Sequence, residues 1–333
     1  MKLVLGFAVP LLFGYVFQQM YNFVDTAIVG RTLGSAALAA VGSTGSLNFL
    51  ILGFCNGICA GFGIPIAQSF GAKDEVEVRR YVTNSVWLAG VISVVMAVIT
   101  AIGTRTMLVW MSTPADILDD AVNYIQLIFA TIPVTMLYNL SGGVLRALGD
   151  SKTPVYYLVL ASVINIVLDI VCIVYFGMGV TGAAFATVVS QLVAGIGCLI
   201  TIKKRFPILK FIRDDWQYRP LFAKRLINIG VPMGLQYSIT AIGSVTLQVA
   251  VNNLGTVAVA AVTAASKLSM VFVCVFDALA TTMATFAGQN VGARKLDRIN
   301  EGLKSASILG IAYCVLAFIT IWLAGKQLIT LFV

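Results

Sequence analysis

The chain has 333 residues, of which 59% are hydrophobic and only 11% are charged, so its composition excludes an ordinary water-soluble domain. It contains no histidine, and its six cysteines form no Cys-x-x-Cys pair, so neither a disulfide framework nor a zinc site is indicated. The net charge of +8 does not indicate a nucleic-acid partner, because the positive residues gather on one side of the apolar stretches. The composition predicts an integral membrane protein.

Apolar stretches of about 20 to 30 residues recur along the chain and lack the alternation of barrel strands, so each is predicted to cross the membrane as a helix. Eighteen of the 22 Lys and Arg residues lie on one side of these spans, which predicts that this side and the N-terminus are cytoplasmic. The fold class is therefore an all-α, polytopic transmembrane bundle in a prokaryotic-type plasma (inner) membrane. The nine expected spans are 4–29, 36–69, 82–103, 121–144, 154–176, 179–202, 222–249, 257–286 and 304–325.

The first span contains Pro10 near its start and Asp25 near its outer end. A proline inside a helix removes one backbone hydrogen bond and bends the helix. We therefore predict Pro10 as a conformational switch whose bend responds to the state of Asp25. A static kink is the alternative.

The second span carries glycine at Gly53, Gly57 and Gly61. Small residues spaced by four lie on one helix face and let another helix approach closely. This series predicts a helix-packing face rather than a substrate site.

Four of the first six spans carry polar residues at a similar depth. A helix rises about 1.5 Å per residue, which places four of these residues roughly 5–12 Å below the outer ends of their spans, and Asn165 one turn deeper than Asp169 on the same helix face. A carboxylate that faces lipid costs about 2.5 to 3.5 kcal/mol, so the two aspartates in this layer are expected to face each other or a shared wet cavity. The layer consists of Asp25, Tyr124, Asn165, Asp169 and Thr187.

A small cation is the expected occupant of this layer. Burial and a second nearby carboxylate both disfavour the charged form, so Asp25 or Asp169 is expected to bind a proton near neutral pH. The same oxygens, with Asn165 and Thr187, would instead coordinate Na⁺, and the sequence leaves the two ions open. Structural hydrogen bonding between helices is the alternative role. No other metal and no organic cofactor is expected.

An internal repeat sets the architecture. At an offset of 221 residues, TLGSAALAAV (32–41) matches NLGTVAVAAV (253–262), and AQSFGAK (67–73) matches GQNVGAR (288–294). Six spans separate the copies, so both point the same way and are related by an axis along the membrane normal. A complete second copy would run to about residue 440, so we expect a fragment or a truncated second lobe.

The repeat divides the chain into three parts. Residues 1–204 are predicted to form a six-helix lobe, and residues 222–333 an incomplete lobe of three helices. The cytoplasmic linker at 205–221 is basic and aromatic and is expected to lie along the headgroups as a solvated hinge, with specific lipid recognition as the alternative. Lys267 and Asp277 of the second lobe are possible cavity-lining residues.

No enzyme is predicted. GMGVTG (177–182) matches a dinucleotide fingerprint only formally, because it follows a membrane helix rather than a strand. Two intramembrane aspartates can form a protease, but the Gly-x-Gly-Asp pattern of that class is absent.

Seven motifs together resemble the multidrug and toxic compound extrusion (MATE) family. The resemblance implies twelve spans in two lobes around a central cavity, and export of cationic, amphiphilic organic compounds in exchange for H⁺ or Na⁺. The chain departs from that pattern because it stops after nine spans and has no carboxylate in its seventh span. The motifs are FQQMYNFVDTAIVG (17–30), ALAAVG (37–42), QSFGAKD (68–74), LRALGDSKTP (145–154), NIVLDI (165–170), GAAFATVVSQ (182–191) and GQNVGA (288–293).

The resemblance also implies roles for individual residues. In prokaryotic members the N-terminal cation site corresponds here to Asp25, Tyr124, Asn165, Asp169 and Thr187. A bend at the position of Pro10 accompanies the switch in that family. We expect a monomer that contacts membrane lipids and small organic substrates. The alternatives are a flippase of the same superfamily for lipid-linked oligosaccharides and a passive channel or structural membrane protein.

Overall fold

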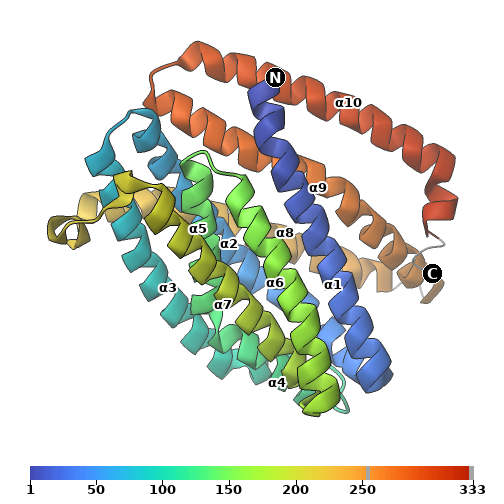
Figure 1. Cartoon of the computed structure of the whole chain (residues 1–333). Coiled ribbons are helices and arrows are strands. Elements are labelled where there is room, and N and C mark those ends of the chain that lie inside the picture. The colour runs from blue at the N-terminus through green and yellow to red at the C-terminus, as the bar shows by residue number, and fades with distance from the viewer. Residues whose placement is uncertain (253–255, 330–333) are drawn as a thin grey trace.

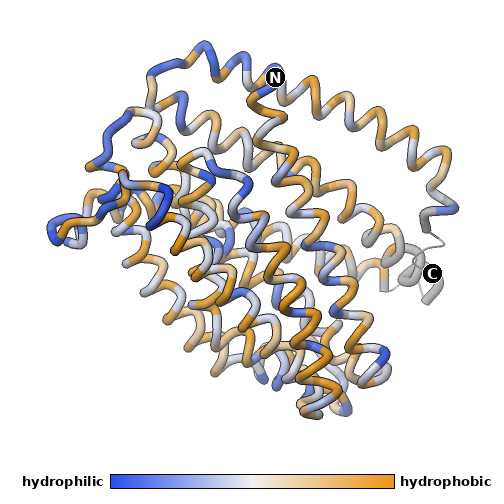
Figure 2. The backbone as a smooth tube through the Cα atoms, viewed as in Figure 1, coloured by the Kyte–Doolittle hydropathy of each residue, from blue (hydrophilic) through white to orange (hydrophobic). Residues whose placement is uncertain are grey.

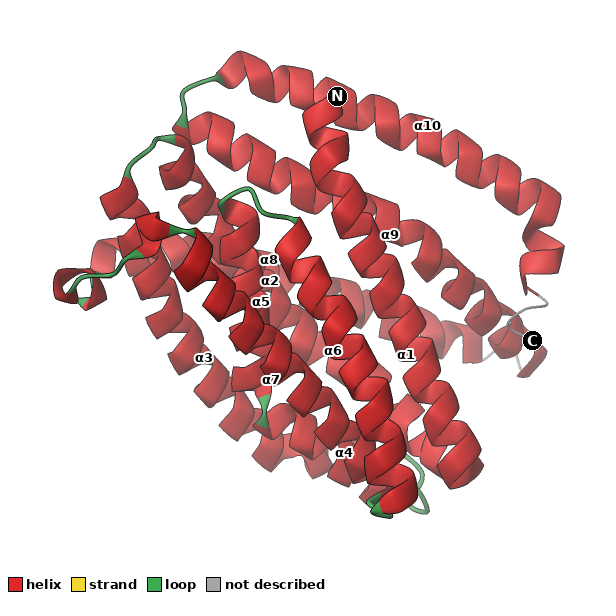
Figure 3. Cartoon of the chain, in the orientation of Figure 1, coloured by secondary structure: helices red, strands yellow, loops and turns green. Residues whose placement is uncertain are grey.

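Long helices dominate the chain because a backbone in lipid has to satisfy its hydrogen bonds internally. The computed structural model describes residues 1–252 and 256–329, and their side chains except at positions 248, 249, 252, 256–261, 263, 264, 267, 326, 328 and 329. Within these residues the fold is an all-α polytopic bundle with no strand (Figures 1 and 3). The elements are α1 (Lys2–Ser43), α2 (Gly45–Gly71), α3 (Glu75–Trp110), α4 (Leu118–Ala130), α5 (Ile132–Ala147), α6 (Lys152–Ile170), η1 (Val171–Tyr175), α7 (Gly179–Arg205), η2 (Pro207–Leu209), η3 (Arg213–Trp216), α8 (Pro220–Asn252), α9 (Thr256–Gly292) and α10 (Leu296–Ile329).

Eight of the nine expected spans correspond to described helices that are long and apolar enough to cross a membrane. Six are single helices, and a seventh is α6 together with η1. The eighth is the pair α4 and α5, which is bent by 48°. The remaining helix, α8, is 33 residues long but is not among them. Polar residues such as Gln236, Ser238 and Thr240 lower its mean hydropathy.

The start of the second span differs from the prediction. The sequence predicts a helix from residue 36, whereas α2 begins at Gly45. Residues before it continue α1 after a break at Gly34, where φ is 86° and ψ is −177°. Glycine adopts this backbone conformation without the steric cost that a side chain would impose. Helical structure continues through Pro10, so the break in α1 lies at Gly34 rather than at the proline.

The repeat is visible in the helix boundaries. Helices α2 and α9 end at Gly71 and Gly292, which are 221 residues apart. Lys73 and Arg294, at the same offset, both have a positive φ, of 61° and 56°. We refer to α1–α7 as the N-terminal lobe and to α8–α10 as the C-terminal lobe.

Polar loops gather at one end of the bundle. Figure 2 shows hydrophilic backbone where α2, α5, α7 and α9 end and where α1 begins, while the helices between are mainly hydrophobic. We call this the basic end, defined by the loops at 72–74, 148–151, 206–219 and 293–295. From it the N-terminal and C-terminal helices spread apart toward the opposite end (Figure 1).

The linker between the lobes is held against α3. Asp215 is buried and accepts hydrogen bonds from Nε of Arg79 and from the backbone N–H of Ile212, each at 3.0 Å. The hydroxyl of Thr83 donates to the carbonyl oxygen of Asp215 at 2.6 Å. Asp215 therefore anchors this segment to α3, while Ile212, Trp216 and Tyr218 of the same segment remain exposed.

The glycine face of α2 packs against α8, which confirms its predicted structural role. A Cβ at Gly57 would stand 2.5 Å from the carbonyl oxygen of Met233, and one at Gly61 would stand 2.6 Å from Cα of Gly230. On the other side, a Cβ at Gly234 would lie 2.9 Å from the carbonyl oxygen of Phe54. Backbone contact at this range requires glycine on both helices.

We predict that Gly57→Leu separates α2 from α8 and lowers the midpoint of thermal unfolding of the detergent-solubilised protein. Overpacking costs about 1–3 kcal/mol, and here the obstacle is backbone that has no rotamer to change. Gly90→Leu is the matched control, because no atom lies within 4 Å of a Cβ built at Gly90. Equal midpoints for the two variants would contradict this packing.

Candidate functional site

Four helices of the N-terminal lobe bring the predicted polar layer together. Asp25 lies on α1, Tyr124 on α4, Asn165 and Asp169 on α6, and Thr187 on α7. Helices α1, α4, α6 and α7 pack against one another, so residues far apart in sequence share one depth. The structure therefore places all five predicted residues in one cluster.

The centre of the cluster is a pair of carboxyl groups. Asp25 and Asp169 lie within hydrogen-bonding range of each other. Asp169 is fully shielded at 0% exposure and Asp25 is 9% exposed. Both side chains face the interior of the lobe rather than lipid, as the cost of a lipid-exposed carboxylate requires.

Asn165 orients one member of this pair. It is 0% exposed and lies one helical turn before Asp169, so the two side chains share a face of α6. With its amide nitrogen toward Asp169, it donates to Oδ2 at 3.0 Å, and its oxygen accepts from the backbone N–H of Thr187 at 3.1 Å. The amide thus ties α6 to α7 and fixes the rotamer of Asp169.

Two tyrosines close the site from α1 and α4. Tyr124 is 8% exposed and lies within electrostatic range of both carboxyl groups. Tyr21, which the sequence reasoning missed, lies within the same range and makes a side-chain hydrogen bond with Thr187. Its position four residues before Asp25, on the same helix face, was the available signal.

Each carboxyl group retains one oxygen that the described residues leave unsatisfied. Oδ1 of Asp25 and Oδ1 of Asp169 are buried and accept no hydrogen bond. Buried polar atoms in native proteins are nearly always paired, so an orphaned acceptor on each side of a carboxyl pair points to a cationic ligand. A proton shared between the two carboxyl groups, or Na⁺ bound between them, would satisfy such oxygens.

Other donor sets for a metal ion do not occur near the pair. Within the described residues, no three His, Cys, Asp or Glu side chains form a group that could hold a metal ion. The two aspartates offer carboxylate oxygens, which are the ligands of a hard cation.

The backbone changes directly after Asp169. Residues Val171–Tyr175 form one turn of π-helix, and the N–H of Phe176 donates to the carbonyl of Val171 at 3.1 Å. Such turns interrupt α-helices mostly at functional sites. No sequence pattern predicts this turn.

Two further predicted residues, Pro10 and Asp277, lie outside the cluster. Pro10 is partly buried in α1, toward the basic end. Asp277 is exposed on α9 and lies within electrostatic range of Tyr237 on α8. The side chain of Lys267 is outside the described residues.

Comparison with known proteins agrees with the motifs. The family model MatE matches residues 10–171 and 232–333. A relative in Bacillus subtilis, "Probable multidrug resistance protein YoeA", is 31% identical over 98% of this chain and 72% of its own length. A second from the same organism, "Probable multidrug resistance protein YpnP", is 29% identical over 100% of this chain and 74% of its own.

A solved structure shares the fold. It is described as the outward-facing conformation of a multidrug resistance MATE family transporter of the MOP superfamily, and it superposes with a TM-score of 0.92 at 24% identity. The match covers 99% of this chain and 74% of that one. The chain belongs to the MATE family of membrane transporters.

We predict that Asn165→Ala lowers the midpoint of thermal unfolding more than Asn139→Ala does. Removing Asn165 leaves a buried carboxyl oxygen of Asp169 without its donor, at a cost of about 1–3 kcal/mol. Asn139 is a fair control because its amide donates only to the carbonyl of Thr135 in its own helix. A smaller or equal loss for Asn165→Ala would show that it does not bridge α6 and α7.

Proposed function

We propose that this protein is a secondary active antiporter that exports cationic, amphiphilic organic compounds in exchange for H⁺ or Na⁺ by alternating access. Its relatives are named for multidrug resistance, which supports drug-like substrates. The basic end would face the cytoplasm of a plasma (inner) membrane, following the positive-inside rule. A single chain would carry the ion site, so a monomer suffices.

The buried carboxyl pair is the observation that carries the proposal. Two carboxylates in a water-poor site repel each other, so the pair binds a positive ion more tightly than either group alone. Asp25 and Asp169 would bind the ion, and Asn165, Thr187 and Tyr124 would orient them. An ion that binds one conformation better than the other shifts the protein toward that conformation.

Helix α1 offers a route from the ion to the other lobe. It carries Asp25 in the cluster, and its Tyr15 hydroxyl lies 3.0 Å from that of Thr281 on α9. Pro10 lies five residues before Tyr15, at the point where a bend would move this contact. Release of the ion would let α1 move relative to α9.

The two lobes meet at the basic end. A Cβ at Gly71 would overlap the carbonyl oxygen of Gln289, and one at Gly292 would overlap the carbonyl oxygen of Gln68. The helices of the two lobes spread apart from there toward the opposite end (Figure 1). With the basic end in the cytoplasm, this arrangement would correspond to the outward-facing state of the proposed cycle. Asp277 and Tyr237 would meet the cationic substrate there.

The membrane potential supplies enough free energy for export. One charge that crosses about 100 mV supplies roughly 2.3 kcal/mol. This corresponds to about a fiftyfold gradient of a neutral compound.

Asp169→Asn keeps the shape of the side chain and removes its charge, so we predict loss of drug-dependent H⁺ or Na⁺ flux. Flux is measured in reconstituted vesicles with a fluorescent organic cation and an ion gradient. Asp119→Asn is the control, because Asp119 pairs with Arg105 at the exposed surface. It is expected to retain wild-type flux.

Unchanged coupling in Asp169→Asn would refute the ion site. Loss of folding is checked by the elution profile and thermal midpoint of each variant. If no organic cation moves in the wild type and a lipid-linked sugar does, the flippase alternative replaces the antiporter.

A further inference from the structure

Two cavities flank the first turns of α1 at the basic end. One has a volume of about 530 Å³ and lies between α1, the α5–α6 loop and the end of α7. The other, of about 370 Å³, lies between α1, the α5–α6 loop, α9 and the start of α10. They share Leu3, Phe7 and Gly149, so α1 separates two parts of one hollow. Neither part touches the Asp25–Asp169 cluster.

The charge of this hollow is strongly positive. Five cationic side chains line it against a single acid, Asp150. Among the described residues only one of the five, Arg205, has an ion-pair partner, at 3.9 Å from Asp150. The five cations are Lys2, Lys152, Arg205, Lys295 and Arg298.

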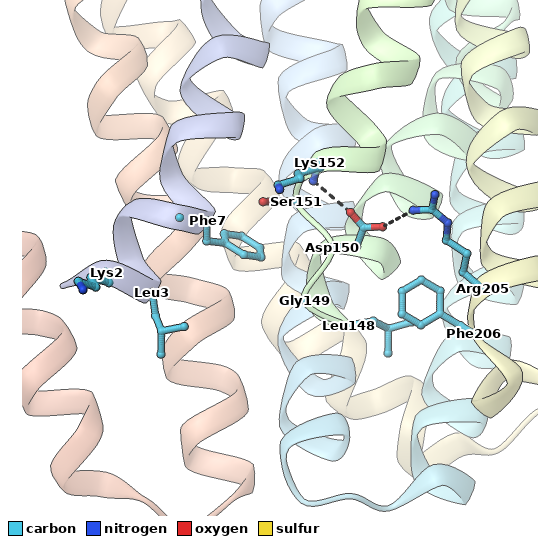
Figure 4. A pocket seen from close by; sticks show the side chains of 11 residues that line it. Lys2, Leu3, Phe7, Leu148, Gly149, Asp150, Ser151, Lys152, Arg205 and Phe206 are labelled. Atoms are coloured by element: carbon cyan, nitrogen blue, oxygen red, sulfur yellow. Dashed lines mark hydrogen bonds and ion pairs between the residues drawn. The ribbon is translucent and has the colours of Figure 1, made fainter.

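Asp150 is already committed to the loop that holds it. Its Oδ1 accepts from the backbone N–H groups of Lys152 at 3.1 Å and Thr153 at 3.0 Å, and its Oδ2 accepts from the Thr153 hydroxyl at 2.6 Å. In Figure 4 its carboxylate lies between Lys152 and Arg205. This carboxylate acts as a helix cap for α6 and leaves most of the positive charge without compensation.

Apolar side chains form the rest of the walls. Phe7 projects from α1 toward the α5–α6 loop, and Leu148 lies beside Phe206 on the other side (Figure 4). Phe286 of α9 lines the second part. A hollow with cations at the polar edge of a membrane helix bundle and aromatic walls fits an anionic headgroup with the start of its acyl chains. Free phosphate would use only the cations.

We propose that this hollow binds the phosphate of an anionic phospholipid in the leaflet at the basic end. Lys295 and Arg298 lie on the C-terminal lobe, whereas Lys2 and Lys152 lie on the N-terminal lobe. The second part, which Lys295 and Arg298 line, also touches Gly71 and Gly149 of the N-terminal lobe, so a headgroup bound there contacts both lobes. Lipid binding at this hollow is independent of the antiport activity.

The second part of the hollow lies where the two lobes meet, which links lipid binding to the relative position of the lobes. Its lining includes Gly71 and Gln289, the residues at which α2 and α9 meet. Nε2 of Gln289 also donates to the carbonyl of Ala147 at 2.8 Å, which joins α9 to α5. Separation of the lobes at this end would dismantle the second part. The lipid therefore stabilises the state in which the basic end is closed.

The test compares lipid retention by the full chain. Protein purified from nanodiscs of phosphatidylcholine, with or without phosphatidylglycerol, is released for native mass spectrometry, and bound phosphatidylglycerol is titrated. Lys295→Gln/Arg298→Gln removes two of the lining cations and is expected to weaken binding about 30-fold. Lys203→Gln/Lys204→Gln removes the same charge from the exposed end of α7, outside both parts, and is expected to bind as the wild type does.

Three further arms make the outcome unambiguous. Lys295→Arg/Arg298→Lys keeps both charges and is expected to restore binding if the lining cations act through charge. Phosphatidylglycerol is expected to raise the thermal midpoint of the wild type and the control, but not of Lys295→Gln/Arg298→Gln. Equal retention by the two Gln variants would overturn the proposal. An equal thermal shift with inorganic phosphate would overturn the assignment to a lipid.

Discussion

Two carboxyl groups share one buried site in this protein, and the surrounding lobe is arranged around the cost of keeping them there. Asp25 and Asp169 come from α1 and α6, lie within hydrogen-bonding range and retain one unsatisfied oxygen each. Such a pair is stable in a water-poor interior only if a positive ion compensates it. The amide of Asn165 holds one carboxyl group, so the geometry of Asp169 would persist during the proposed exchange of the ion.

The rest of the structure connects the carboxyl pair to the C-terminal lobe. Helix α1 contributes Asp25 inside the N-terminal lobe and reaches α9 through Tyr15 and Thr281. Contacts between glycine backbones at Gly57 and Gly234 allow the lobes to approach closely along α2 and α8. Close backbone packing transmits small displacements, because such interfaces have few intermediate arrangements. In the proposed mechanism, ion binding at the carboxyl pair would therefore have a mechanical path through α1 to the C-terminal lobe.

The spans, the lobes and the depth of the carboxyl pair were predictable because they depend on hydropathy, helical rise and the internal repeat, which can be read along the sequence. Hydropathy over some 20 residues marks the spans, and the rise per residue places Asp25 and Asp169 at one depth. The repeat at 221 residues predicts the lobes, and the helix boundaries at Gly71 and Gly292 follow it. The glycine series on α2 predicts close packing, although not its partner.

The features that escaped prediction depend on contacts between distant segments. Tyr21 looks like an ordinary interfacial tyrosine until its hydrogen bond with Thr187 of α7 is seen. The linker composition predicts a hinge, but the pair of Asp215 with Arg79 joins residues 136 positions apart. The basic hollow likewise combines α1, two loops and two C-terminal helices. No short stretch of the sequence contains all the residues of such a site.

Infrared difference spectroscopy of the purified protein tests the carboxyl pair most directly. Spectra are recorded while the pH is raised or Na⁺ is added. We expect a protonated-carboxyl band that disappears under one or both changes in the wild type and is missing from Asp25→Asn and from Asp169→Asn. A band that persists in both variants, or wild-type spectra that respond to neither ion, would contradict the claim that this pair is the ion site.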